Sequence, residues 1–172
     1  GLTTLQFSNV LFGQGGADTI VGGDGQDLIQ YDPQDLSYDF GLATAVTGFD
    51  DLLLTDQSLT LGGAGPVITN LDRIAVPETS AAAPITVTMN VADMIAVTTG
   101  PAAQSVLYVD ANPDPNGVSD AIIAGTGWIP RVGGPFADPV NAQSGRLYNV
   151  WDGTGGAVLW VNANIANTAG LR

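Results

Sequence analysis

The chain has 172 residues, of which 45% are hydrophobic, so it is long enough to bury a core. Its 17 acidic residues against four basic ones give a net charge of −13. Nucleic acids and anionic membrane surfaces are bound through clustered Lys and Arg, so this balance argues against both as partners. No apolar run approaches the roughly 18 residues of a membrane span, and we expect no membrane insertion.

The chain contains no cysteine and no histidine. Disulfides, thiolate catalysis and zinc–thiolate sites are therefore excluded, and the commonest general base is absent. No N-terminal signal peptide is visible. Because the chain starts at Gly1 rather than at a methionine, we expect a fragment or a processed piece whose upstream signal or domain is missing.

Residues 13–30 consist of two successive blocks of nine, GQGGADTIV and GGDGQDLIQ. The second block matches the pattern G-G-x-G-x-D-x-U-x at every specified position, and the first differs only at Gln14. This nonapeptide is associated with calcium-binding parallel β-helices. Two blocks in register are a more specific signal than one Gly–Asp turn, although ordinary acidic turns remain the alternative.

The spacing suits the chemistry of a calcium turn. The first six residues of a block form a tight turn whose carbonyl groups point toward one ion, and glycine permits the positive φ angles that this needs. The closing aspartate adds a carboxylate, an oxygen ligand that Ca²⁺ prefers. The last three residues form a short strand whose apolar residue, Ile20 or Ile29, points inward. One full coil takes two blocks, so turns stack on alternate sides.

This geometry selects the candidate ligands. The turn that ends at Asp18 should face residues 31–36, and the turn that ends at Asp27 should face residues 4–9 or 40–45. Both neighbouring turns lack most of the motif glycines, and we expect about one to three calcium ions. The candidate metal ligands are Asp18, Asp27, Asp24, Asp32, Asp35 and Asn9, with the turn glycines Gly13, Gly15, Gly22 and Gly25.

From about residue 48 the chain becomes a series of short β-type runs, at 51–54, 58–61, 67–68, 73–76 and 84–89. In the last run the residues Ile85, Val87 and Met89 alternate with threonines, the period of a half-buried strand. Residues 90–97 break the alternation. Asn90 can cap a helix there, and Val91, Met94 and Ile95 fall on one helical face.

Further strands are predicted at 106–109, 122–124, 128–129, 147–151 and 158–161. The last two are separated by DGTGGA, which indicates a hairpin. We expect Trp151 and Trp160 to pack in a core across this hairpin. The stretch 131–145 contains two prolines and three glycines and is predicted to be a long surface loop.

A second acidic stretch, 110–120, places Asp110, Asn112, Asp114 and Asn116 at alternate positions, as in the ligand spacing of an EF-hand loop. Pro115 stands where that loop requires glycine, and no glutamate closes the site. A Pro/Asn/Asp turn between two strands is the favoured interpretation, and a second type of calcium site is the alternative.

With its nonapeptides, the chain resembles the C-terminal regions of RTX proteins exported by bacterial type I secretion, especially giant adhesins. The order of the segments after the repeats is also similar to such regions; they lie at 48–55, 69–76, 85–97, 106–112, 125–129 and 148–161. The resemblance implies a secretion-associated module outside the cell, with calcium and the type I secretion machinery as partners. Low cytosolic calcium would keep the acidic turns open for export, and millimolar calcium outside would fold them.

Three other functions stay open. Catalysis would depend on Asp, Ser, Tyr or Glu78 alone, and we expect the chain not to be an enzyme. A calcium-dependent carbohydrate-binding adhesin module is the second alternative, with Trp128, Trp151, Trp160 and Tyr148 available to stack on sugar rings. A self-assembling extracellular lattice or filament subunit is the third, because exposed edge strands invite pairing.

The sequence therefore predicts an all-β protein. Residues 1–40 should form a short parallel β-roll with calcium-binding nonapeptide turns, and residues 48–172 should continue it as a β-solenoid or sandwich with one short helix. The predicted role is a calcium-dependent folding and structural module of a secreted bacterial surface protein.

Overall fold

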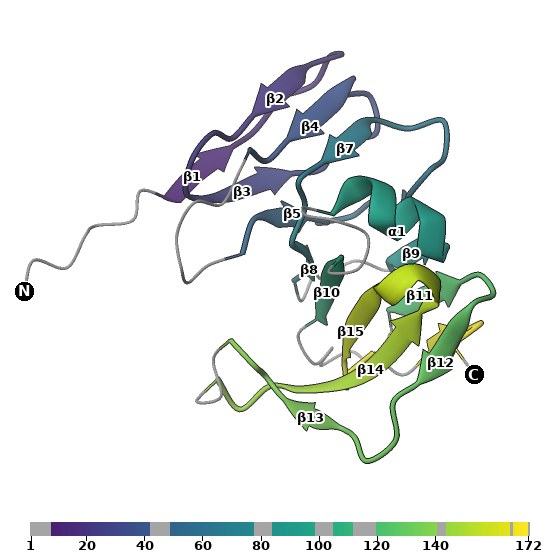
Figure 1. The fold of residues 1–172 in the computed structure, drawn as a ribbon. Coiled ribbons are helices and arrows are strands. Elements are labelled where there is room, and N and C mark those ends of the chain that lie inside the picture. Colours follow the sequence, from purple (N-terminus) through teal and green to yellow (C-terminus); the bar gives the residue numbers. More distant parts are fainter. Residues whose placement is uncertain are drawn as a thin grey trace, which may run out of the picture.

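The computed structural model describes residues 8–41, 49–77, 84–98, 105–111, 120–140, 144–165 and 167–171. This part of the chain is mostly β-strand with one short helix, which confirms the predicted all-β class (Figure 1). The strands are β1 (Ser8–Leu11), β2 (Thr19–Val21), β3 (Gln26–Gln30), β4 (Ser37–Asp39), β5 (Asp51–Leu53), β6 (Leu59–Thr60), β7 (Val67–Thr69), β8 (Arg73–Val76), β9 (Thr86–Met89), β10 (Val106–Ala111), β11 (Ala121–Ala124), β12 (Trp128–Pro130), β13 (Phe136–Ala137), β14 (Leu147–Gly153), β15 (Val158–Asn162) and β16 (Asn167–Ala169).

The first four strands alternate between two sheets. β1 pairs in parallel with β3, and β2 pairs in parallel with β4. In both pairs a residue lies beside the one 18 positions further along the chain, as the side-chain hydrogen bonds Asn9–Asp27 and Ser37–Thr19 also show. Two blocks of nine residues therefore separate strands that lie directly on one another.

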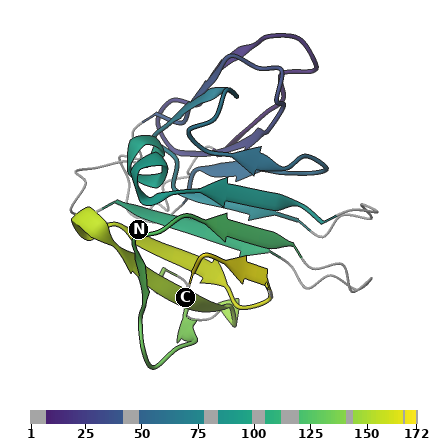
Figure 2. The same cartoon turned by 90° about the vertical axis from the view of Figure 1, so that its right-hand side faces the viewer.

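The longest sheet continues this stacking through the molecule in the order β1-β3-β5-β8-β10-β15-β14-β12. Every pair from β1 to β15 is parallel, whereas the pairs that β14 makes with β15, β12 and β13 are antiparallel. Two further sheets have the orders β2-β4-β7 and β6-β9-β11-β16, and all their pairs are parallel. Figure 2 shows the strands of successive coils stacked on one another.

The core follows from this register. Ile29, Leu52, Ile74, Val109 and Val161 are neighbours on successive strands of the long sheet, and none of their side chains has any exposed surface. Each strand thus places one aliphatic side chain over that of the strand before it. Burial of such side chains stabilises a fold by about 1.5–3 kcal/mol each. One continuous apolar cluster extends from β3 to the last described residues.

The predicted helix is α1 (Val91–Val97). Asn90 caps it, because its side chain accepts the N–H of Asp93 while the Asp93 carboxylate accepts the N–H of Asn90. Val91, Met94 and Val97 are buried, and Ile95 packs partly against the core. No helix in the described part of the chain is long and apolar enough to cross a membrane.

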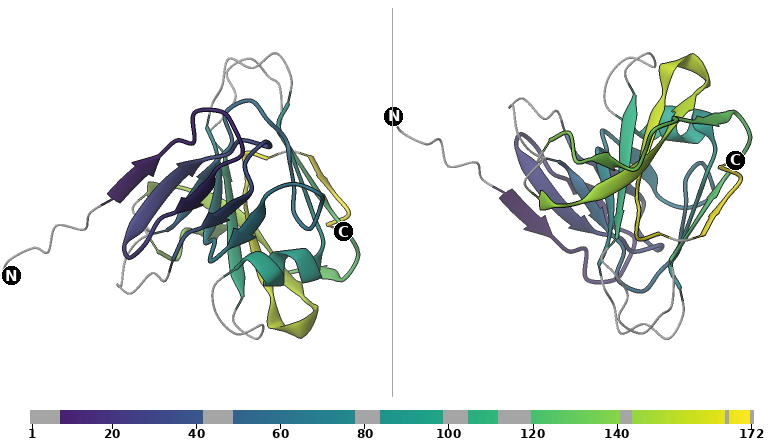
Figure 3. Two further views of the ribbon diagram at one scale, coloured as in Figure 1. Left: turned by 90° about the horizontal axis from the view of Figure 1, so that it is seen from above. Right: turned by 90° about the horizontal axis from the view of Figure 1, so that it is seen from below.

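The predicted hairpin is present: β14 and β15 are antiparallel, with the turn η3 (Thr154–Gly156) between them. The view from below shows it in front of the first coils, at the opposite end of the molecule (Figure 3). The expectation that Trp151 and Trp160 share one core is wrong. Trp151 lies opposite Leu159, so Trp160 faces the other side of the sheet. The predicted loop 131–145 also contains a strand, β13, which pairs with β14.

Candidate metal centre

The turns of the two nine-residue blocks share a left-handed backbone conformation at two equivalent positions. Gly16 and Gly25, the fourth residues of their blocks, have φ angles of 125° and 120°. Gln14 and Gly23, the second residues, have φ angles of 63° and 99°. The left-handed region is readily open to glycine and costly for most other residues. The second and fourth positions of the motif therefore keep their conformation in both turns, although one glycine has been replaced, whereas the third position has a positive φ only at Gly15.

Successive turns lie at two edges of the coils, one with the Asp18 turn and one with the Asp27 turn. At the first edge, the turn of Asp18 lies against residues 31–36, as the spacing predicts. The backbone N–H of Asp18 donates to Asp35 Oδ1 at 3.2 Å, and the N–H of Leu36 donates to the Asp18 carbonyl at 2.7 Å. Both carboxylates gather over Gly13. A Cβ at this glycine would stand 3.0 Å from Asp18 Oδ2 and 3.2 Å from Asp35 Oδ1. Asp18 Oδ2 is buried and has no hydrogen-bond partner.

Tyr38 completes this edge, and the sequence analysis did not single it out. Its side chain is fully buried, and its hydroxyl donates to Asp35 Oδ2 at 2.6 Å while accepting the N–H of Asp32 at 2.7 Å. Burial and the Asp35 hydrogen bond raise the pKa of Tyr38, so the hydroxyl stays protonated. The turn at residues 31–36 lacks the motif glycines, and the hydrogen bonds of Tyr38, the second residue of β4, stabilise it instead.

At the second edge, the turn of Asp27 has a neighbour on either side. Asn9 Nδ2 donates to Asp27 Oδ1 at 2.7 Å, and on the other side Gly41 lies against the carbonyl of Gly23. Asp27 Oδ2 is buried without a hydrogen-bond partner, and a Cβ at Gly22 would stand 2.2 Å from it. Residues 4–7 and 42–45 of the predicted facing turns lie outside the described part of the chain.

At this edge a column of aspartates, Asp27, Asp50 and Asp72, continues beyond the repeats. The N–H of Asp27 donates to Asp50 Oδ1 at 2.9 Å, and the N–H of Asp50 donates to Asp72 Oδ2 at 3.2 Å. Asp50 is 1% exposed, and its Oδ2 has no hydrogen-bond partner. Burial, then the charges of Asp72, Asp27 and Asp51, raise the pKa of Asp50 to about 7 against the lowering effect of the Asp27 N–H.

The remaining candidate ligands are placed differently. Asp24 is exposed at the tip of its turn. Asp32 accepts the N–H of Gln34 at 2.9 Å, which closes a local turn. Among the described residues, no three carboxylates are grouped so that they could hold one metal ion between them. An ion in either turn would therefore need backbone carbonyl groups beside one or two carboxylates, which is a donor set that Ca²⁺ accepts.

Asp110, the first residue of the EF-hand-like stretch, is occupied by other partners. Its carboxylate accepts Asn162 Nδ2 at 2.6 Å and forms an ion pair with Arg146, and Arg73 lies 3.8 Å away. Residues 112–119, with the other three predicted ligands of that stretch, lie outside the described residues. The alternative of a calcium site there consequently has no support from Asp110.

The aromatic residues considered for sugar stacking are mostly enclosed. Trp128 and Trp151 are 5% and 6% exposed, and Tyr148 is 1% exposed. Trp160 is half-buried on the outer face of the long sheet, where it stacks on Tyr108 with ring centroids 5.7 Å apart. The three buried rings are therefore closed to a sugar, and Trp160 already stacks on Tyr108.

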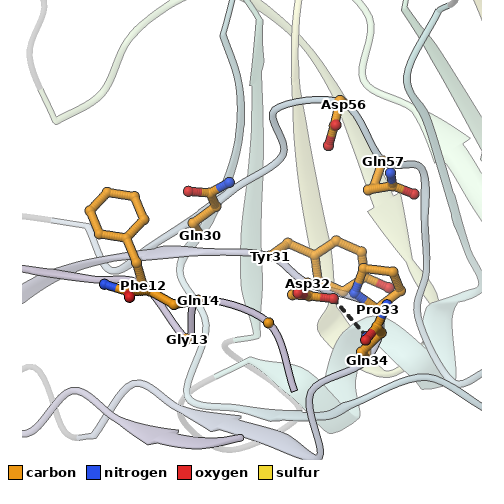
Figure 4. Close-up of a pocket in the computed structure, with 11 residues that line it drawn as sticks. Phe12, Gly13, Gln14, Gln30, Tyr31, Asp32, Pro33, Gln34, Asp56 and Gln57 are labelled. Carbon is orange, nitrogen blue, oxygen red and sulfur yellow. Dashed lines mark hydrogen bonds between the residues drawn. The ribbon is translucent and has the colours of Figure 1, made fainter. Parts of the chain in front are cut away.

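An open hollow of about 570 Å³ borders the first edge. Its lining comes from the Asp18 turn, from the end of β3 and the turn after it, and from the loop between β5 and β6. Figure 4 shows Phe12 on one side, Pro33 and Gln34 on the other, and Asp56 and Gln57 above.

Comparison of the chain with protein-family models, with curated proteins and with solved structures finds no match. Any function must therefore be argued from the residues themselves.

Proposed function

We propose that this chain is a calcium-dependent folding and structural module of a secreted bacterial surface protein, from its C-terminal secretion-associated region. In this proposal residues 1–40 are a parallel β-roll with calcium in its turns, and residues 48–172 continue it as a β-solenoid or sandwich. The proposed partners are calcium and the type I secretion machinery. The proposed location is outside the cell, and no catalytic role is assigned.

One observation carries the calcium assignment. In each of the two glycine-built turns, the closing aspartate has a buried oxygen without a hydrogen-bond partner, Asp18 Oδ2 at one edge and Asp27 Oδ2 at the other. An unpartnered buried carboxylate oxygen is costly, since its lost hydration is not replaced. A divalent cation beside each turn would supply the missing partner, and the glycines leave room where a Cβ would collide with the same oxygens.

The physical role follows from charge. Aspartates from successive coils lie close together at both edges, in a chain of net charge −13. Asp18 contacts Asp35 at one edge, and Asp27, Asp50 and Asp72 follow one another at the other edge. Without counter-ions this repulsion opposes closure of the coils. Calcium bound at the turns would add binding energy to folding, because the unfolded chain has no assembled site. At a free concentration 100 times Kd, one ion adds about 2.7 kcal/mol.

The test compares thermal unfolding of the protein, followed by far-UV circular dichroism, in Ca²⁺, in Mg²⁺ and in chelator. We expect a large rise in melting temperature with Ca²⁺ and little with Mg²⁺, which demands a smaller and more regular site. Asp18→Asn and Asp27→Asn should each remove part of the calcium gain. The exposed Asp56→Asn is the matched control. Equal unfolding curves in Ca²⁺ and chelator would reject calcium and favour ordinary acidic turns.

Self-assembly into an extracellular lattice or filament is a second candidate with an observation of its own. Within the described residues, β1 and β2 pair on one side only, and Val10, Phe12 and Val21 beside these edges are more than half exposed. Open strand edges pair readily with other chains. Sedimentation at increasing protein concentration, in Ca²⁺ and in chelator, separates this candidate from a monomeric module.

A further inference from the structure

The hollow beside the first edge has a lining of unusual chemistry for a protein with so many carboxylates. Four glutamine side chains reach it from three separate segments, together with two aspartates and two aromatic residues; these are Gln14, Gln30, Gln34, Gln57, Asp32, Asp56, Phe12 and Tyr31. Its volume lies within the roughly 300–1,000 Å³ that small-molecule sites occupy.

The amides are available to a ligand. Gln14, Gln34 and Gln57 make no side-chain hydrogen bond within the described residues, and only Gln30 is engaged, by donating to Thr55 Oγ1 at 3.3 Å. Each primary amide offers two donors and an acceptor in one plane. Three such groups around one opening can bind several hydroxyl groups, each of which also donates and accepts.

Phe12 adds an apolar face to this polar ring of side chains. It is 53% exposed, although a phenylalanine of this size gains by burial, and Figure 4 shows it at the side of the hollow opposite Pro33 and Gln34. The C–H face of a sugar ring would cover it while the hydroxyl groups at the ring edge reach the amides.

We propose that this hollow binds a neutral sugar, as a single pyranose or as the end of an oligosaccharide. Phe12 stacks on the ring, Gln14, Gln34 and Gln57 bind hydroxyl groups, and the carboxylates of Asp32 and Asp56 accept the strongest hydrogen bonds. The site is distinct from the tryptophan-based sugar site considered from the sequence, of whose aromatic residues Trp128, Trp151 and Tyr148 are buried.

The charge of the lining selects a neutral ligand over an anion. The hollow has two carboxylates and no arginine, so phosphate, sulfate or uronic acid groups would be repelled. An organic cation is the competing ligand, because carboxylates and aromatic rings attract it. It would use only the amide oxygens, since an ammonium group donates hydrogen bonds and accepts none, and the N–H groups of the three free amides would be left without a ligand partner.

The test uses ¹⁵N-labelled protein and follows the side-chain amide signals of Gln14, Gln34 and Gln57 by NMR. The probes are methyl glycosides of glucose, mannose and galactose, N-acetylglucosamine, maltotriose and cellotriose, with choline chloride as the cationic probe. At least one sugar should shift these signals at about 10 mM, a concentration that detects affinities near 1 mM. Parallel titrations in Ca²⁺ and in chelator keep the result separate from that of the calcium proposal.

Two variants test the assigned contacts. Phe12→Ala and Gln57→Ala should each weaken binding of that sugar by about three- to tenfold while leaving the melting temperature unchanged. Val132→Ala, at a side chain that is 90% exposed on the far part of the chain, is the matched control and should bind like the wild type. Absence of any sugar-induced shift, shifts with choline alone, or equal binding by both hollow variants would overturn the proposal.

Discussion

Gln14 and Gly23 occupy the same place in two successive turns, nine residues apart, and both have a positive φ, 63° and 99°. Gln14 is therefore a non-glycine residue held in the left-handed region by the turn around it. For most side chains this conformation costs roughly 1–2 kcal/mol, because Cβ approaches the following carbonyl oxygen. The first turn thus carries a strain that the second turn avoids.

The first prediction is that Gln14→Gly stabilises the protein by about 1 kcal/mol, because glycine adopts this φ without the steric penalty. The greater chain entropy of glycine in the unfolded state reduces the gain. Urea-induced unfolding of both proteins in the same calcium concentration measures the difference.

Gln34→Gly is the control for this prediction. Gln34 lies in the neighbouring turn, is exposed like Gln14, and is not among the residues with positive φ. There glycine should lower the stability by about 0.5–1 kcal/mol, since only its entropic cost remains. Two substitutions of equal sign would contradict the assignment of strain to Gln14.

The second prediction concerns pH and Asp50, whose pKa is raised from 3.8 to about 7, first of all by burial. Between these two values the folded protein holds a proton that the unfolded chain has lost. The contribution of Asp50 to stability is therefore full below pH 3.8 and is lost as the pH rises through 7. Asp50→Asn keeps an acceptor for the Asp27 N–H and should remove this part of the decline.

Melting temperatures of the wild type and of Asp50→Asn, in chelator from pH 5 to pH 8, measure this effect. The two proteins should differ most at the alkaline end, where the asparagine variant is the more stable. The exposed Asp56→Asn serves as the comparison and should follow the wild type. Parallel pH profiles of Asp50→Asn and wild type would show that Asp50 is charged throughout.

The repeats explain why part of this arrangement can be predicted from the sequence. A nine-residue pattern sets turns, strands and inward residues at fixed spacing, so the contact between the Asp18 turn and residues 31–36 follows from counting. Beyond the repeats the spacing becomes irregular. Asp27 binds Asp50 at a separation of 23 residues and Asp50 binds Asp72 at 22, so their alignment depends on a register that no motif specifies.

Strands without apolar alternation were missed for a similar reason. β4 contains the residues Ser37, Tyr38 and Asp39, and β16 contains Asn167, Thr168 and Ala169, neither of which has the composition of a strand. Both pair in parallel with a neighbouring coil, which fixes their conformation through tertiary contacts. The capped helix and the hairpin were predictable, because their signals are local.

The third prediction tests the ion pair between Arg73 and Asp51. Arg73 Nε and Nη2 each donate to one carboxylate oxygen of Asp51 at 2.6 Å, and the guanidinium lies 4.7 Å from the centre of the Phe49 ring. Both charged side chains are less than one-fifth exposed. Arg73→Leu should destabilise the protein by about 3 kcal/mol, because it leaves the Asp51 charge buried and unpaired.

The double variant Asp51→Leu/Arg73→Leu should recover most of that loss, since no charge is left without its partner. Chemical unfolding of the two single variants and the double variant completes the cycle. The more exposed pair of Arg131 and Asp152 provides the contrast, and Arg131→Leu should cost no more than about 1 kcal/mol. Additive effects at Asp51 and Arg73 would argue against a coupled pair.

The fourth prediction concerns the start of α1. Asn90 accepts the N–H of Asp93 at 2.9 Å, and Asp93 returns a hydrogen bond by accepting the N–H of Asn90 at 3.2 Å. Asn90→Ala removes the first bond and should lower the free energy of unfolding by about 1 kcal/mol, whereas Asn90→Ser keeps a capping oxygen and should lose only a few tenths. Because Val97 at the other end of the helix accepts the N–H of Leu71, fraying of this helix should also speed hydrogen exchange at Leu71. Alanine and serine variants of equal stability and equal exchange would show that the cap contributes nothing to holding the helix on the coils.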